Sequence, residues 1–298
     1  MQNPPTIHIQ IADRWKDYEL IDSGNGEKLE RFGKFIFRRP EAQAVWQPAL
    51  PAAWGKADAV FETTGEENGG HWNFRKPLPE KWKMAYGSLE FYATAGASRH
   101  LGVFPEQATQ WDWVAEKIRA AGRPVKVLNL FGYTGLASLA AATAGADVTH
   151  VDASKKVITW ARENQTLSGL SDKPVRWIVD DALKFVEREA RRNSLYDGII
   201  LDPPKFGRGP KGEVWEFFKL FPQLLSACGT ALARDPLFLV ITAYAVKSSA
   251  LTLHGAVNEL MSARTGTLEV GEIATRENSA GRIISNALYA RWYSDKPR

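Results

Sequence analysis

The sequence predicts a doubly wound α/β fold, in which a mostly parallel sheet of seven strands follows a smaller antiparallel β domain. From Thr109 onward, apolar runs of strand length alternate with helical patterns, which is typical of a parallel sheet. Several of these strands end at glycines or acidic residues, where open α/β sheets bind their ligands. Residues 1–108 show short apolar segments between turn residues instead. We therefore expect two domains, residues 1–108 and residues 109–298.

The first domain is predicted to be β-rich. Its apolar segments at 35–37, 59–61 and 89–93 are separated by Gly, Pro and Asn, the residues that favour turns. Tryptophans recur between these segments. They fit either a base-stacking surface or a core, and we take the core as the default because large aromatic side chains bury so much apolar area. The five are Trp15, Trp46, Trp54, Trp72 and Trp82.

The second domain begins with an amphipathic helix. Trp111, Val114, Ala115 and Ile118 recur at helical spacing, and Gly122 follows as a stop. Alternating patterns then predict strands at 125–130, 148–151, 176–179, 196–201, 237–242, 268–273 and 284–292. Predicted helices lie between them, at 136–144, near 157–169, at 183–190, around 224 and at 253–261. Strand and helix alternate through most of this domain.

The stretch from 125 to 152 has the strand-helix-strand pattern of a nucleoside-binding unit. Gly132 and Gly135 end the first strand, and Asp152 ends the second, twenty positions after Gly132. A carboxylate there can accept both ribose hydroxyls, and the helix start offers unpaired N–H groups. The glycine-rich dinucleotide pattern is incomplete, so a cofactor without a pyrophosphate, such as S-adenosylmethionine, fits better than NAD. Alternatively, the glycines only form a tight turn and Asp152 only caps a helix.

Two further strand ends carry acidic residues. One strand ends at Asp180 and Asp181, and the next at Asp202-Pro203-Pro204. Two prolines fix the backbone and remove two donors, so this turn would aim carbonyls and a carboxylate at a ligand. The alternative is a plain strand that prolines terminate. Because parallel strands end at one edge of the sheet, we expect these residues to converge on one crevice.

Composition sets limits on the class of protein. Apolar residues make up 44% and charged residues 24%, as in an ordinary globular protein. No run is long enough to span a bilayer and no signal pattern opens the chain, so we expect a cytoplasmic protein. The single cysteine excludes an internal disulfide, and five scattered histidines predict no metal site. A net charge of +4 mildly favours a nucleic-acid partner. The oligomeric state is left open.

The order of these motifs resembles the class I S-adenosylmethionine-dependent methyltransferases, specifically the group that methylates large-subunit ribosomal RNA. The resemblance is carried by Leu128-Asn-Leu-Phe-Gly-Tyr-Thr-Gly, Val151-Asp, Val179-Asp-Asp-Ala and Leu201-Asp-Pro-Pro-Lys-Phe. It spans about residue 86 to the C-terminus and includes Leu101-Gly-Val-Phe-Pro-Glu-Gln, similar to a segment that covers the cofactor in that family. The resemblance implies a Rossmann-like methyltransferase sheet and S-adenosylmethionine as cofactor.

The resemblance also implies roles for single residues. Residues 131–135 would surround the methionine part of the cofactor, Asp152 would bind the ribose, and Asp181 rather than Asp180 would accept from the adenine amino group. The whole implied cofactor set is Phe104, Gln107, Asn129, Phe131, Gly132, Tyr133, Thr134, Gly135, Asp152, Ala153, Asp181, Ala182 and Asp202. The implied catalytic set, which faces the acceptor, is Asp202, Pro203, Pro204, Lys205 and Phe206.

The implied activity is direct methyl transfer to a base of ribosomal RNA. Such a displacement needs chiefly an acceptor held close and in line. A cysteine adduct is not expected, because the only thiol, Cys228, lies in an apolar helical segment. The alternatives are a small-molecule or protein methyltransferase on the same fold, a nucleoside-cofactor-binding protein without catalysis and, less favoured, an oxidoreductase.

Overall fold

The computed structural model describes residues 4–64, 69–96 and 98–295, which divide into two compact units. Unit 1 comprises residues up to Gln10, Thr109–Ile273 and residues from Asn286 on, and unit 2 comprises Ile11–Ala108 and Ala274–Ser285. One boundary between the two units lies at Thr109. Neither unit is continuous along the chain, however, because the first strand pairs in the sheet of unit 1 and a segment near the C-terminus belongs to unit 2.

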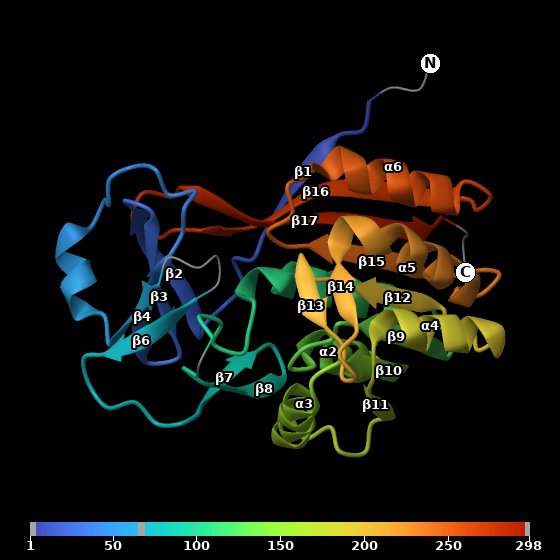
Figure 1. Ribbon diagram of the computed structural model, residues 1–298, viewed down its shortest axis with the longest axis horizontal. Coiled ribbons are helices and arrows are strands. Elements are labelled where there is room, and N and C mark those ends of the chain that lie inside the picture. Colours follow the sequence, from blue (N-terminus) through green and yellow to red (C-terminus); the bar gives the residue numbers. More distant parts are fainter. Residues whose placement is uncertain (1–3, 65–68, 97, 296–298) are drawn as a thin grey trace. The chain divides into compact units, whose positions relative to one another are not determined.

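Unit 1 contains the α/β sheet. Within the described residues this sheet has eight strands in the order β1-β16-β17-β15-β12-β9-β10-β11 (Figure 1). The seven strands predicted from the sequence are present, and the eighth, β1, adds to the edge beside β16. The strands are β1 (Ile7–Ile11), β9 (Val125–Leu130), β10 (Ala146–Asp152), β11 (Val175–Val179), β12 (Gly198–Leu201), β15 (Phe238–Ala243), β16 (Gly266–Arg276) and β17 (Ile283–Ser294).

The pairing of the central strands is parallel. β11, β10, β9, β12 and β15 pair in parallel, in that order, and β17 runs antiparallel to β15. A separate hairpin of β13 (Phe206–Arg208) and β14 (Val214–Glu216), which the sequence did not predict, follows β12. Five parallel strands thus present their carboxyl ends at one edge of the sheet.

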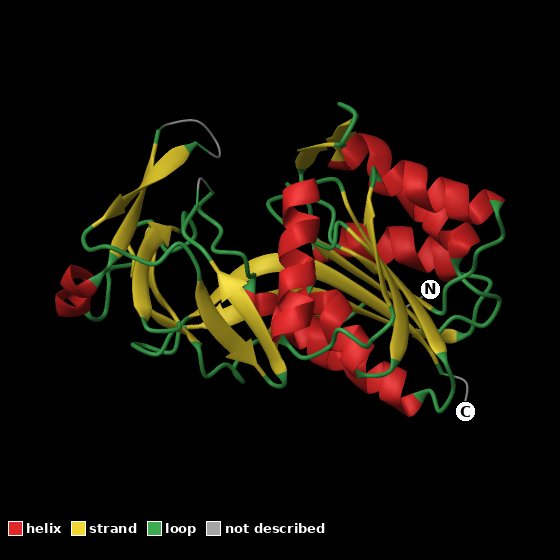
Figure 2. Cartoon of the chain, turned by 90° about the horizontal axis from the view of Figure 1, so that it is seen from below, coloured by secondary structure: helices red, strands yellow, loops and turns green. Residues whose placement is uncertain are grey.

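Helices cover both faces of this sheet (Figure 2). On one face, α4 (Ala182–Arg191), α5 (Phe217–Ala231) and α6 (Ala250–Met261) pack on Leu128, Leu130 and their neighbours. On the other, α1 (Ala108–Ala120) and α2 (Leu136–Thr143) pack on Val125 and Val127. Successive strand residues therefore serve opposite cores, which explains the continuous apolar runs. α3 (Lys155–Leu167) packs against α2 and β11. In the described part of the chain, no helix is long and apolar enough to cross a membrane.

Unit 2 is β-rich, as predicted. Its described residues form a five-stranded sheet, β2 to β6 in chain order, and a β7–β8 hairpin; only the β4–β5 pair of the larger sheet is parallel. Of the tryptophans expected in the core, Trp72 and Trp82 are buried, whereas the other three are half-buried. The elements are β2 (Tyr18–Gly24), β3 (Glu27–Phe32), β4 (Phe35–Pro40), η1 (Pro51–Lys56), β5 (Ala59–Thr63), β6 (Gly70–Phe74), β7 (Trp82–Tyr86), β8 (Leu89–Ala93) and η2 (Pro105–Gln107).

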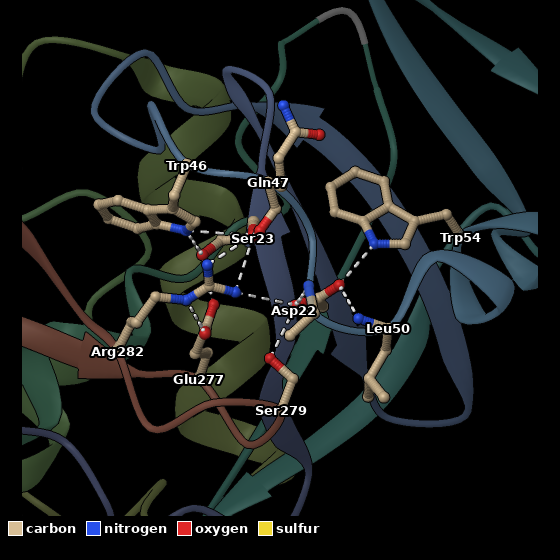
Figure 3. A network of polar contacts seen from close by, with 10 residues as sticks. Asp22, Ser23, Trp46, Gln47, Leu50, Trp54, Glu277, Ser279 and Arg282 are labelled. Atoms are coloured by element: carbon tan, nitrogen blue, oxygen red, sulfur yellow. Dashed lines mark hydrogen bonds and ion pairs between the residues drawn. The ribbon is translucent and has the colours of Figure 1, made fainter.

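A buried polar network holds the 274–285 segment in unit 2 (Figure 3). The Asp22 carboxylate is fully buried and accepts hydrogen bonds from Trp54 Nε1 at 2.8 Å and from Ser279 Oγ at 2.7 Å. Glu277 is also buried and pairs with the Arg282 guanidinium. Because a buried charge is costly without partners, these contacts fix the segment to strand β2. This network explains why the unit is discontinuous in sequence.

Candidate active site

Strand register brings three predicted site segments to the same edge of the sheet. Leu130 of β9 aligns with Val151 of β10 on one side and with Leu201 of β12 on the other. The residues that follow these three are Phe131, Asp152 and Asp202. Val179 aligns with Asp152, so the acidic pair after β11 lies at the next strand end. The convergence that the sequence predicted is therefore present in unit 1.

The loop after β9 has an unusual backbone. Phe131, Tyr133 and Gly135 have φ values of 58°, 51° and 88°, in the left-handed region. This conformation is strained for Phe131 and Tyr133, and such strain persists only where surrounding contacts impose it. The Phe131 ring packs on Trp215 at 5.0 Å between centroids, and the carbonyl of Thr134 accepts a 3.0 Å hydrogen bond from the buried Asn164 amide. The loop is thus held in one shape.

Three N–H groups of this loop are already used within the protein. Gly132 N donates to the Val151 carbonyl at 3.1 Å, Tyr133 N to Asp152 Oδ2 at 3.0 Å, and Gly135 N to the Gly132 carbonyl at 3.1 Å. These donors belong to the loop and not to the first turn of α2, so the expectation that the helix start offers unpaired N–H groups stays a prediction. The three loop donors are not open to a phosphate.

A buried chain of polar side chains supports the loop from beneath. The Asn129 amide donates to Ser138 Oγ at 2.9 Å, and Ser138 Oγ lies 2.9 Å from His150 Nδ1. Burial lowers the His150 pKa to about 3, so the ring is neutral near pH 7. Asn129, expected among the cofactor contacts, is 1% exposed, and its contact with a cofactor stays a prediction.

The His150 ring explains why position 132 is glycine. A Cβ built there would lie 2.3 Å from Cε1 and 2.5 Å from Nδ1 of the ring. The ring cannot easily move, because Trp177 packs against it at 4.6 Å between centroids. Sequence reasoning missed His150, although a polar residue inside a buried apolar strand was the signal available. The glycine thus allows the loop to lie directly on the imidazole.

Asp152 is oriented by two backbone groups. Its Oδ2 accepts from Tyr133 N at 3.0 Å and its Oδ1 from Ser154 N at 2.9 Å. Burial raises the pKa of this carboxyl, and the two hydrogen bonds oppose that rise. Each carboxylate oxygen can accept a further hydrogen bond, so the group can still bind a diol. Ala153 follows it, half-buried, at the strand end.

The two acidic residues after β11 have different surroundings. Asp180 Oδ2 is in an ion pair with Arg188 at 2.6 Å, and its Oδ1 accepts from Asp181 N at 2.9 Å. Asp181 is the N-cap of α4, where its Oδ1 accepts from Lys184 N at 2.9 Å, and Ala182 behind it is buried. Among the described contacts Asp181 Oδ2 has no partner, which leaves it more capacity to accept than Asp180 has.

Asp202 and the two prolines form the turn after β12. Asp202 is half-buried, Pro203 is buried and Pro204 is half-buried, while Lys205 and Phe206 are exposed. The Pro204 carbonyl accepts a 2.6 Å hydrogen bond from Trp215 Nε1. Trp215, which the sequence reasoning missed, therefore joins this turn to the loop at Phe131. The short run Val-Trp-Glu gives no sequence signal for this position.

The remaining predicted cofactor contacts, Phe104 and Gln107, belong to unit 2. Gln107 is 8% exposed, and its backbone N–H donates to the Phe104 carbonyl at 3.0 Å in the turn of η2. The Phe104 ring lies 4.8 Å from the His100 ring. Their contact with a cofactor stays a prediction. In the described residues, no group of three or more His, Cys, Asp or Glu side chains is placed to hold a metal ion.

Comparison with known proteins identifies the family. The model of the S-adenosylmethionine-dependent methyltransferase family matches residues 25–248. A segment of 170 residues, 55% of the chain, is 35% identical to the ribosomal RNA large subunit methyltransferase K/L of Shewanella sp. strain W3-18-1. The match spans only 23% of that relative's length. The family is thus shown over most of the chain, and the ribosomal RNA relatives match part of it.

Solved structures share this fold. The SAM-dependent methyltransferase from Agrobacterium tumefaciens is 47% identical, with a TM-score of 0.92 over 98% of this chain and 97% of that one. The protein SMU.776, crystallised with SAH, is 17% identical, with a TM-score of 0.73 over 94% of this chain and 76% of that one. At that identity the second likeness shows the fold alone.

The site fits the cofactor of this family. The sulfonium cofactor has a ribose diol but no phosphate, and the structure offers an oriented carboxylate at Asp152 beside a loop in which three N–H groups are already engaged. Asp152 would hold the ribose, and residues 131–135 would lie along the methionine part. When bound, the cofactor supplies an electrophilic methyl group. The chain belongs to the S-adenosylmethionine-dependent methyltransferase family.

Proposed function

We propose that this enzyme transfers the methyl group directly to a base of ribosomal RNA. The observation that carries the proposal is that the Asp202-Pro203-Pro204 turn and the Asp152 carboxylate end strands on either side of β9, at the same edge of the sheet. An acceptor at the proline turn would then lie beside a cofactor held by Asp152. Catalysis by displacement requires this closeness and alignment above all.

The acceptor would be oriented by Asp202. An exocyclic amine can donate to its carboxylate and keep its lone pair directed at the methyl group. Both Asp202 and the carbonyls of the proline turn were candidates for this role. The Pro204 carbonyl already accepts a hydrogen bond from Trp215, so we assign the role of orienting the acceptor to the Asp202 carboxylate. Pro203 and Pro204 would hold this carboxylate in place, and Lys205 and Phe206 would contact the base or its backbone.

Direct transfer is supported by the state of the only thiol. Cys228 lies in α5, is fully buried, and burial raises its pKa far above the usual range. A thiol that attacks a pyrimidine ring must reach the substrate as a thiolate. Cys228 meets neither condition, because it is buried and its raised pKa disfavours the thiolate. A route through a cysteine adduct, and hence 5-methylcytosine as the product, is therefore not part of the proposal.

RNA as the substrate is supported by the ribosomal RNA relatives and by local charge. Lys205, Arg208 and Lys211 are exposed and directly follow the proline turn. Binding of a polyanion by such groups releases counterions, so RNA affinity should fall as salt rises. A filter-binding assay across a salt series measures this. A flat dependence, with turnover intact, would point to a small-molecule acceptor instead.

The main experiment compares modified nucleosides of ribosomal RNA from cells with and without the gene, by mass spectrometry. One methylated base should disappear with the gene and return when purified enzyme, cofactor and the unmodified RNA are combined. Asp202→Ala should lower turnover by about two orders of magnitude or more, because acceptor positioning is lost, while cofactor affinity changes little. Asp172→Ala, an exposed carboxylate in unit 1, is the matched control. Equal losses of turnover and cofactor affinity would refute the role of Asp202.

A further inference from the structure

The β13–β14 hairpin and the first turn of α5 carry large apolar side chains that are exposed to solvent. Phe206, Val214 and Phe218 are 53%, 48% and 59% exposed. Single exposed apolar residues are ordinary, but three within thirteen residues on one small element indicate a contact surface. Trp215 and Phe217, which alternate with them, are buried. The hairpin therefore has a buried inner side and an apolar outer side.

Strand register defines the outer side of the hairpin. Phe206 pairs with Glu216, and Arg208 pairs with Val214, so these four side chains lie on the same face. A ring and a guanidinium two residues apart on one strand present a stacking surface next to a positive charge. Phe218 and Lys219, both exposed, follow at the start of α5. We call Phe206, Arg208, Lys211, Phe218 and Lys219 the hairpin surface.

The charges of the hairpin surface are available to a partner. In the described part of the chain, Arg208, Lys211 and Lys219 are exposed and in no ion pair, whereas the nearby Glu213 is taken up by Lys184 at 2.7 Å. The surface thus combines flat rings with three such cations, which outnumber the exposed carboxylate on the same face, Glu216. This is the combination that binds single-stranded nucleic acid, in which unpaired bases stack on rings and phosphates meet cations.

The hairpin is fixed to the acceptor turn. Trp215 Nε1 donates to the Pro204 carbonyl at 2.6 Å, and Phe217 N donates to the Lys205 carbonyl at 3.0 Å. Phe206 follows Asp202 by four residues, a span of at most about 14 Å of extended chain. A strand held on the hairpin would therefore lie within reach of the site at Asp202, without a loop having to order first.

We propose that the hairpin surface binds the nucleotides that flank the target base, and that the enzyme accepts this base from a single-stranded segment of RNA. The proposal rests on the proposed function and names the form of its substrate. Bases in a duplex are stacked on one another and cannot lie on Phe206 or Phe218. Cations alone would not discriminate between the two forms, but the rings do.

The test uses fluorescence anisotropy with a short labelled single-stranded RNA and its duplex at fixed salt. The full-length enzyme should bind the single strand more tightly. Arg208→Ala with Lys211→Ala should weaken binding about tenfold or more and reduce the steepness of the salt dependence. The charge-matched control, Arg191→Ala with Arg234→Ala, removes two exposed arginines outside the hairpin surface and should stay close to the unmodified enzyme.

A second set of variants tests stacking itself. Phe218→Leu keeps an apolar side chain but loses the ring, and should weaken single-strand binding several-fold, whereas Phe218→Trp should retain it. Unchanged binding in Phe218→Leu and in the double arginine-lysine variant would overturn the hairpin proposal while leaving RNA methylation intact. If the enzyme binds the duplex more tightly than the single strand, the hairpin proposal is likewise overturned. If the unmodified enzyme neither binds nor methylates RNA, the proposed function itself is refuted.

Discussion

Replacing Gly132 by alanine tests how the cofactor loop is supported. The new methyl carbon would lie 2.3 Å from Cε1 of His150, closer than non-bonded carbons approach. The ring is held by Ser138 and by Trp177, so the loop has to shift instead. Overpacking of this kind costs about 1–3 kcal/mol of unfolding free energy. Because the backbone at residue 132 is not left-handed, the cost is steric alone.

Urea unfolding gives the stability, and calorimetry gives the affinity for S-adenosylmethionine, which should also fall because the loop is displaced. Gly255→Ala is the matched control, since a Cβ there meets no atom within 4 Å and lies within α6, where alanine is favoured over glycine. Combining Gly132→Ala with His150→Ala should recover part of the loss, giving a double-mutant coupling of about 0.5 kcal/mol or more. Strictly additive losses, or a fully stable Gly132→Ala enzyme, would refute the steric argument.

Three other changes test separate parts of the site. Asp152→Ala should weaken S-adenosylmethionine binding by about 1.5–3 kcal/mol, because charge-assisted hydrogen bonds are lost; calorimetry that finds NAD bound more tightly than S-adenosylmethionine would contradict the assignment. The pKa of His150 is about 3 in the folded protein, whereas its ordinary value is 6.5. The contribution of the neutral ring to the free energy of unfolding is therefore complete above pH 6.5 and is lost as the pH falls toward 3. Between pH 8 and pH 5 this loss is about 2 kcal/mol by linkage, and urea unfolding of His150→Gln should show a shallower fall over that range; an equally steep fall would exclude His150 as its source. Cys228→Ala should leave turnover within about twofold, since the thiol is buried away from solvent; production of 5-methylcytosine that this variant abolishes would overturn both direct transfer and the placing of the site.

Local sequence pattern was enough to predict the strands, their ends and the family of this protein. Runs such as 125–130 and 237–242 are apolar because helices cover both faces of the parallel sheet. These runs allowed the strands and their ends to be predicted. Parallel strands end at the same edge of a sheet, so the sequence alone predicted that Asp152, Asp181 and Asp202 lie at one edge. Sequence order also carried the family resemblance, which the family model confirms.

Local pattern does not identify the partners that folding brings together from distant parts of the chain. β1 pairs beside β16, and Gly271 is required there because a Cβ would meet the His8 backbone, yet nothing local marks residues 7–11 for that edge. The network at Asp22 draws 274–285 into unit 2 by contacts more than 250 residues apart.

The same holds within the site. The Asn129 amide nitrogen donates to Ser138 Oγ, and Trp215 donates to the Pro204 carbonyl, which was a candidate group for holding the methyl acceptor. Residue type and spacing state which hydrogen bonds a side chain is able to make. Which of them it does make depends on the partners that folding brings within 3 Å, because buried polar groups are satisfied by whatever donors and acceptors packing leaves beside them.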